Sequence, residues 1–183
     1  MMRAALFALL ISALPAWASD NDGKPLPAIG TVQVFFTPGQ NATAGLVDAI
    51  RQAQHTLLVQ AFSFTSNEIA FALIDAKRRG VEVQVIADAE QTRKLESNKI
   101  ALLAHAGVKV LIDEQHQSAH NKVMVIDAES ANPVLVTGSM NFTYAAQFKN
   151  AENLLILRGN KPLTEAYAAN WQRHKLHALP FRQ

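Results

Sequence analysis

Residues 120–127 of this 183-residue chain read His-Asn-Lys-Val-Met-Val-Ile-Asp. The four residues that precede Asp127 are apolar, which predicts a strand buried in the core. His120 and Lys122 are two residues apart at the entry to that strand, so we expect their side chains to emerge on the same face. An imidazole beside an ammonium at a rigid edge suits a phosphate group, because the ammonium neutralises the non-bridging oxygens while the histidine stands close to phosphorus.

A second strand is predicted over residues 134–138, and the chain continues from Gly138 as Ser139-Met140-Asn141. Only a short loop joins the two strands, so they must form an antiparallel hairpin. The hairpin brings Ser139 and Asn141, two neutral hydrogen-bond donors, beside His120 and Lys122. The glycine lets backbone come close to a ligand. These four side chains form the candidate site.

Strand-like and helix-like patterns alternate along the rest of the chain. Strands separated by helices imply parallel pairing with right-handed crossovers, whereas the hairpin adds antiparallel strands. The sequence therefore predicts a single α/β domain, a three-layer α-β-α sandwich around a mixed central sheet. The expected strands are 31–37, 56–62, 81–87, 108–112, 122–127, 134–138 and 153–158, and the expected helices are 41–54, 66–79, 95–106 and 162–177.

The amino-terminal stretch predicts export. Residues 1–18 combine a positive Arg3, an apolar run over 4–14, and Ala16-Trp17-Ala18, the small-x-small pattern read by signal peptidase. The apolar run is shorter than the roughly 20 residues of a membrane span, so an uncleaved anchor is the less favoured alternative. We expect a signal peptide over 1–18 cleaved near Ala18, a polar linker over 19–30 and a catalytic domain over 31–180. The protein would then be periplasmic or secreted, with no stable membrane insertion after cleavage.

The amino-acid composition limits the kinds of stabilising site and partner that the protein can have. Hydrophobic residues make up 49% of the chain, enough for a real core, and there is no cysteine, which excludes disulfides and thiolate metal sites. The formal charge of +2 says little about partners by itself. Three basic clusters could follow a phosphate backbone, although charge runs at helix ends are more often solvated faces: Lys77-Arg78-Arg79, Arg93-Lys94 and Arg173-His174-Lys175.

The two hairpin motifs together resemble the HxKxxxxD…GSxN signature of the phospholipase D superfamily. The run over 138–143 with Glu152-Asn153 after it is similar to the small single-motif bacterial nucleases of the Nuc type. Residues 62–65 and 170–172 are similar to that group as well, so the resemblance covers nearly the whole of the expected mature chain.

The resemblance implies a role for each matching residue. His120 would be the nucleophile that forms a phosphohistidine intermediate, and Lys122 and Asn141 would bind the phosphoryl oxygens with Ser139 assisting. Glu152 matches the family carboxylate that holds the other ring nitrogen of the histidine. The motif aspartate, Asp127, is expected to be structural rather than a proton carrier. Phe62 and Phe64 are expected to be strand aromatics, one of which, assigned to Phe64, lines the substrate groove.

The chain departs from the family pattern in one place. The segment between Asp127 and Gly138 is longer than usual, and we expect the extra residues at the 129–133 tip, away from the site. If they instead shift the strand register, the roles of Ser139 and Asn141 do not follow.

A metal site is the main alternative reading of the loop before the first strand, where Asp113, Glu114, His116 and His120 crowd together. Their order is not HExxH and no helix is expected there to align them, so we expect neither a metal nor a cofactor. His174 and His177 are read as cations at a helix end.

A phosphodiester cleaved through phosphohistidine needs a nucleophile on one side and a general acid on the other, yet the motif occurs once. The simplest solution is a twofold homodimer that places two copies of His120 across one phosphate. The substrate expected from the resemblance is nucleic acid, DNA and also RNA, cleaved without sequence preference. The alternatives are a phospholipase D or phosphatidyl transferase acting on phospholipids, and a non-catalytic nucleic-acid-binding module that keeps the fold.

Overall fold

The predicted hairpin lies in the middle of the sheet. Strand β5 (Lys122–Ile126) is entirely buried and pairs antiparallel with β6 (Val134–Gly138), with Met124 opposite Val136. The same register continued by two residues brings Lys122 across from Gly138. The turn over 127–133 joins the other ends of the two strands, so the extra residues of the long loop lie away from the motif and leave its register intact.

The computed structural model describes residues 23–182, so the expected signal peptide and the start of the expected linker lie outside the described residues. The sheet has eight strands in the order β1-β7-β6-β5-β2-β3-β4-β8. Strands β2, β3 and β4 are parallel, and the remaining pairs are antiparallel, which confirms the mixed sheet. The other strands are β1 (Thr31–Thr37), β2 (Thr56–Ala61), β3 (Glu82–Asp88), β4 (Lys109–Asp113), β7 (Glu152–Arg158) and β8 (Leu179–Pro180).

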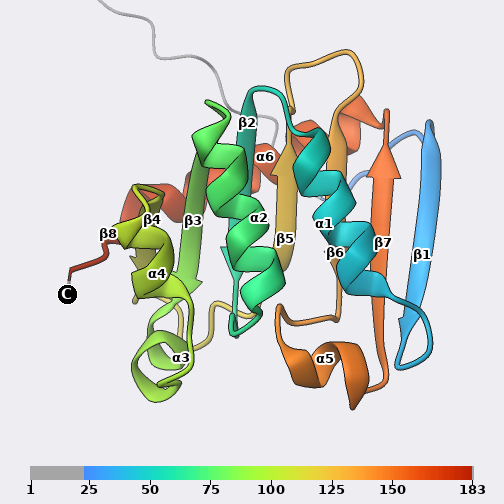
Figure 1. Cartoon of the computed structure of the whole chain (residues 1–183). Coiled ribbons are helices and arrows are strands. Elements are labelled where there is room, and N and C mark those ends of the chain that lie inside the picture. Colours follow the sequence, from blue (N-terminus) through green and yellow to red (C-terminus); the bar gives the residue numbers. More distant parts are fainter. Residues whose placement is uncertain (1–22, 183) are drawn as a thin grey trace, which may run out of the picture.

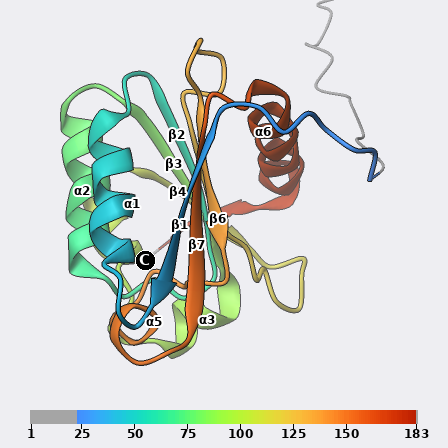
Figure 2. The same cartoon turned by 90° about the vertical axis from the view of Figure 1, so that its right-hand side faces the viewer.

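Helices cover both faces of the sheet, which confirms the predicted three layers. Helices α1 (Ala42–Gln52) and α2 (Asn67–Arg78) pack on one face, and α6 (Lys161–His177) lies on the other (Figure 2). The shorter helices are α3 (Ala89–Lys94), α4 (Ile100–His105) and α5 (Tyr144–Phe148). Among residues 23–182, no helix is both long enough and apolar enough to cross a bilayer.

Two expectations about elements need correction. The helix expected over 95–106 begins only at Ile100, as α4, and a separate helix that was not expected, α3, ends before it at Lys94. The Asn98 amide donates to the carbonyl oxygens of Thr92 and Leu95 and stabilises the turn between the two helices. Strand β8 was not expected; it is two residues long and pairs with the end of β4.

A buried core on each face holds the layers together. The α1/α2 face buries the larger cluster, and α6 closes the opposite face with the fully buried Trp171. Its indole nitrogen donates to the Val59 carbonyl oxygen at 2.9 Å, so the polar end of the side chain is satisfied as well.

Candidate active site

The motif residues meet along one row of strand ends, which is the lower side of the sheet in Figure 1. Strands β2, β3 and β6 end there, and the antiparallel strands β5 and β7 begin there. Helix α5 lies below β6 and β7 at this edge, and α3 lies below β3 and β4 (Figure 1). We call it the catalytic edge.

His120 and Lys122 are in direct contact. The Lys122 Nζ lies 2.9 Å from Nδ1 of His120 and donates to the His120 carbonyl oxygen at 2.7 Å. His120 is exposed, whereas Lys122 is 5% exposed. The Phe62 ring packs beside both residues, with its centroid 4.4 Å from that of His120 and 4.8 Å from Nζ. The imidazole is therefore open to solvent while the ammonium behind it is held in place.

Burial changes the acidity of the lysine. It lowers the pKa of Lys122 to about 8, and the negative charges of Glu152 and Asp88 offset only part of this effect. Because water solvates this ammonium poorly, a bound anionic ligand strongly stabilises its charged form, which is the behaviour expected of a phosphate-binding group.

Ser139 and Glu152 form a second pair at the edge. The Ser139 hydroxyl donates to Oε2 of Glu152 at 2.6 Å and accepts from the backbone N–H of Asn153 at 3.0 Å. The other Glu152 oxygen accepts from the Asn150 amide at 3.1 Å. Among the described residues, the contact expected from Glu152 to the His120 ring is not formed; the ring contacts Lys122 instead.

Asn141 and Gly138 complete the second motif. The Asn141 side-chain oxygen accepts from the backbone N–H of Ser63 at 3.4 Å, which ties the motif to the segment after β2. Gly138 has a φ of +148°, and a Cβ there would collide with the carbonyl oxygen of Asn153 on β7. The glycine is therefore required by the close approach of β7, rather than by an approaching ligand.

Asp127 lies at the far end of β5 from the catalytic edge. Its Oδ1 accepts the backbone N–H groups of His55 and Thr56, and its Oδ2 accepts that of Gln54, each at 2.8 Å. The carboxylate thus anchors the start of β2 to the hairpin turn. The structure does not bring it together with His120.

Phe64, expected to line the substrate groove, does not reach it. It is 2% exposed and packs edge-to-face on Phe142 in the core, with ring centroids 5.6 Å apart. Phe62 takes that place beside His120 instead, because the chain leaves β2 at Ala61 and no longer alternates its faces.

Comparisons with known proteins agree with this geometry. The family model of the cardiolipin synthase, PLD-like domain matches residues 46–175. The chain belongs to the phospholipase D superfamily.

Relatives within the superfamily carry two kinds of name. A phospholipase D from Rickettsia prowazekii is 35% identical over 144 residues, which are 79% of this chain and 67% of the relative. A human mitochondrial cardiolipin hydrolase is 34% identical over 118 residues, 64% of this chain and 45% of that protein. The crystal structure of Nuc from Salmonella typhimurium, a phospholipase D family member, is 30% identical with a TM-score of 0.78, covering 85% of this chain and all of that one.

Two features of this site were missed by the sequence analysis. Asp88, 1% exposed at the end of β3, accepts the backbone N–H of Ala119 at 2.8 Å and so fixes the residue before His120. The exposed rings of Tyr144 and Phe148 on α5 pack together with centroids 4.6 Å apart, just beyond Asn141. An acid at the end of a parallel strand and aromatic residues four apart after the second motif were the signals that could have indicated them.

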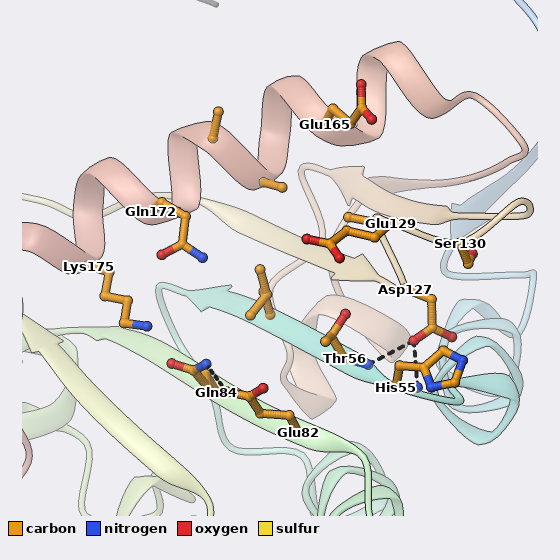
Figure 3. A pocket seen from close by; sticks show the side chains of 14 residues that line it. His55, Thr56, Glu82, Gln84, Asp127, Glu129, Ser130, Glu165, Gln172 and Lys175 are labelled. Carbon is orange, nitrogen blue, oxygen red and sulfur yellow. Dashed lines mark hydrogen bonds between the residues drawn. The ribbon is translucent and has the colours of Figure 1, made fainter. Parts of the chain in front are cut away.

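A large cavity lies away from the catalytic edge. It measures about 880 Å³ and lies between α6 and the sheet, next to the turn that carries Asp127 (Figure 3). Four acidic residues line it, with Lys175 at one end: Glu82, Asp127, Glu129 and Glu165 (Figure 3). Four carboxylates against one ammonium disfavour a phosphate, so we place the chemistry at the edge rather than in this cavity.

Proposed function

We propose that this superfamily member is an exported, non-specific endonuclease that cleaves DNA, and RNA as well, through a phosphohistidine intermediate in a homodimeric active site without a metal ion. The observation that carries the proposal is the exposed His120 ring with the buried Lys122 ammonium 2.9 Å from its Nδ1. A nucleophile and a cation are thereby placed together where a phosphate can reach both.

The reaction proceeds in two steps. A ring nitrogen of one His120 attacks phosphorus and the bond from phosphorus to the leaving oxygen breaks, while the second His120 gives its proton to that oxygen. Water then attacks the phosphohistidine and gives its proton back to the second imidazole, and the nitrogen–phosphorus bond breaks. The products are a phosphomonoester and an alcohol, and both histidines return to their starting states.

The contact with Lys122 sets the position of the proton on the neutral His120 ring, and this position matters for both the attacking ring and the acid. An ammonium only donates hydrogen bonds, so Nδ1 accepts and the neutral ring carries its proton on Nε2. The attacking ring must be neutral with a free Nε2, and it reaches that form when the ammonium turns to a non-bridging oxygen and Nδ1 takes the proton. The ring that acts as the acid is an imidazolium with a proton on each nitrogen, so its Nδ1 also gives up the contact with the ammonium, and loss of the Nε2 proton returns it to the neutral form.

A twofold dimer supplies the second imidazole. His120, Ser139 and Glu152 stand at an edge that is open to solvent, so a second copy can approach it. A dimer through this edge would place two lysines around one phosphate and neutralise both non-bridging oxygens.

Groups beside the catalytic edge favour nucleic acid over lipid. Tyr144 and Phe148 offer rings on which bases can stack, and Lys149 Nζ lies 5.9 Å from the Tyr144 ring centroid. Of the basic clusters, Arg93-Lys94 belongs to α3 at the same edge, whereas Arg79 donates to carbonyl oxygens at the end of α1 and serves structure. The full coverage of Nuc by this chain also supports a nuclease.

The second candidate is a phospholipase D or phosphatidyl transferase acting on phospholipids. It is favoured by the names of the Rickettsia and human relatives. Exposed aromatic side chains such as Tyr144 are also compatible with contact to a membrane interface, whereas the basic residues of α3 fit only the first candidate.

The test supplies both substrate classes to one protein. Plasmid and single-stranded DNA, and separately vesicles of phosphatidylcholine or cardiolipin, are incubated with the protein in excess EDTA, beside His120→Ala and the control His55→Ala. We expect DNA cleavage that survives EDTA, persists in His55→Ala and disappears in His120→Ala. Headgroup release without DNA cleavage would establish the lipid alternative, and no reaction with either substrate would favour the binding module.

A further inference from the structure

Three histidines converge on one buried aspartate away from the motif. Asp113 ends β4, His116 follows it in the loop, and His174 and His177 lie in the last turn of α6. The metal-binding atoms of these four residues all lie within 4.8 Å of one another. The His116 ring centroid is 4.9 Å from that of His174 and 5.2 Å from that of His177. The loop that carries His116 projects on the same side of the sheet as α6 (Figure 2).

The two oxygens of Asp113 share the His116 ring and otherwise have different partners. Oδ1 lies 3.1 Å from His116 Nδ1 and within reach of the backbone N–H groups of Gln115 and His116, at 3.2 and 3.3 Å. Oδ2 lies 2.9 Å from His174 Nδ1, 3.3 Å from His177 Nε2 and 3.0 Å from His116 Nδ1. The backbone contacts orient the carboxylate so that one oxygen points into the group of imidazoles, as outer hydrogen bonds orient a ligating carboxylate.

We propose that Asp113, His116, His174 and His177 bind a divalent transition metal ion, Zn²⁺ in the first place, in a tetrahedral site. In such a site bonds of about 2.0–2.1 Å put neighbouring ligand atoms about 3.3 Å apart. The distances of 2.9–3.3 Å from the Asp113 oxygen to the three nitrogens are close to this spacing. Three imidazoles with one carboxylate select zinc and its neighbours rather than Mg²⁺ or Ca²⁺, which prefer oxygen ligands.

Exposure and charge fit the binding of an ion from solution. The Asp113 side chain is fully buried, whereas 44% of the His116 side chain is exposed, so the ion has an entry path and that ring has room to adjust. Asp113 supplies a carboxylate oxygen that balances part of the charge of a divalent ion.

The site serves structure rather than phosphoryl transfer. Four protein ligands leave no open position on a tetrahedral ion. The site also lies on β4, three strand spacings or about 14 Å from β5 in the sheet order. An ion there would tie the end of α6 to the loop over 114–121, whose far end carries His120.

The site differs from the grouping weighed from sequence. Asp113 and His116 are members, but Glu114 and His120 are not, and two residues of α6 complete the set. His174 and His177 do lie at the helix end, as expected, and they are three residues apart on neighbouring faces of the last turn. The proposal is compatible with metal-free chemistry at His120.

The experiment measures metal binding directly. The protein is stripped with EDTA, dialysed and titrated with Zn²⁺ against a chromophoric chelator, and in parallel with Co²⁺, whose visible absorption reports tetrahedral geometry. His116→Ala removes the most exposed ligand, and His55→Ala removes an exposed histidine outside the group. Circular dichroism before metal addition verifies that each variant is folded, and His174→Ala provides a second ligand deletion.

We expect one ion per chain in the wild type and in His55→Ala, with a tetrahedral Co²⁺ spectrum. At about a hundredfold excess of free Zn²⁺ over its Kd, the melting temperature should rise by about 5–10 °C. His116→Ala and His174→Ala should each weaken binding at least about a hundredfold and lose the rise. Absence of stoichiometric binding in the wild type, or equal binding in the ligand variants, would overturn the proposal and leave Asp113 as a hydrogen-bond acceptor for three imidazoles.

Discussion

The ammonium of Lys122 lies 2.9 Å from Nδ1 of His120, although the two residues differ sharply in exposure. The lysine reaches the histidine from within the sheet, beneath the Phe62 ring. Its charge is therefore shielded from water and directed at whatever the histidine contacts, and the first prediction concerns that charge.

The activity should fall at alkaline pH as Lys122 loses its proton. Burial lowers the pKa of Lys122 to about 8, so the lysine is cationic below this pH and neutral above it. A neutral amine cannot offset phosphate charge, so kcat/KM should decline by about tenfold per pH unit above about 8, as expected for one essential acid in the free enzyme. A Lys122→Arg variant keeps its charge, so the decline near pH 8 should disappear even though a guanidinium fits the site less well. An unchanged alkaline limb in that variant would show that another group titrates.

Asp88 should act as a positioning residue for His120. Its Oδ1 accepts the Gln91 N–H and its Oδ2 accepts the Ala119 N–H, each at 2.8 Å. Asp88→Asn leaves one of these N–H groups facing an amide NH₂, which displaces the loop that carries His120. We expect kcat to fall by about tenfold to a hundredfold, with KM changed much less, because small misplacements of a nucleophile are costly.

The control for Asp88 is Asp48→Asn, which changes an exposed carboxylate on α1. Steady-state kinetics on both variants measure kcat and KM separately, and near-ultraviolet circular dichroism verifies that the packing of each variant is unchanged. If Asp88→Asn raises KM and leaves kcat intact, the residue acts on substrate binding rather than on the position of His120.

Asp127 should matter for stability and not for chemistry. It accepts three backbone N–H groups, and its φ of +50° is tolerated by Asp better than by most other residues. Asp127→Ala should lower the free energy of unfolding by about 1–3 kcal/mol, measured by urea titration, while the folded fraction retains its kcat. His120→Ala should show the opposite pattern, with activity lost and stability nearly unchanged. A catalytic defect in fully folded Asp127→Ala would contradict a purely structural role.

Tyr144 should contribute to binding of single-stranded nucleic acid. The ring is 63% exposed on α5, so its removal costs little stability. Stacking of a base on an aromatic ring contributes about 1–3 kcal/mol, so Tyr144→Ala should raise KM for single-stranded DNA several-fold or more and leave kcat nearly constant. Phe71→Ala, which removes a ring 54% exposed on α2, is the matched control. Equal KM values in the two variants would exclude this stacking surface.

The hairpin and its motif were predictable because local patterns specify them. Residues 123–126 have no polar member, the loop to β6 is too short for a crossover, and the residues two apart at each strand end must share a face. The antiparallel pairing therefore followed from the chain, whereas the effect of the longer loop on the register was left open and was settled by the pairing of Met124 with Val136. The start of the helix expected over 66–79 was predictable as well, since Ser66 caps α2 by accepting from the Ile69 N–H.

What could not be predicted depends on contacts between distant segments. Phe62 and Phe64 are indistinguishable by alternation, because the strand ends between Ala61 and Phe62 and the following bend decides which ring is buried. His174 is 61 residues from Asp113, and only the return of α6 along the sheet brings them to 2.9 Å. The partner of Glu152 could not be predicted either, because the sequence does not show whether His120 or Ser139 lies nearer to its carboxylate. In the fold that partner is Ser139.

The strongest prediction of the dimeric site concerns mixed dimers. If one phosphate needs His120 from both subunits, a dimer with one wild-type chain and one His120→Ala chain has either the nucleophile or the acid, but not both. Wild type and variant are mixed at varied ratios, allowed to exchange subunits, and assayed on single-stranded DNA. Specific activity per total protein should follow the square of the wild-type fraction, because only wild-type dimers are competent. A linear dependence would mean that each chain cleaves by itself. Light scattering on the same samples verifies that dimers are present throughout, so that a linear result counts against the shared site and not against association.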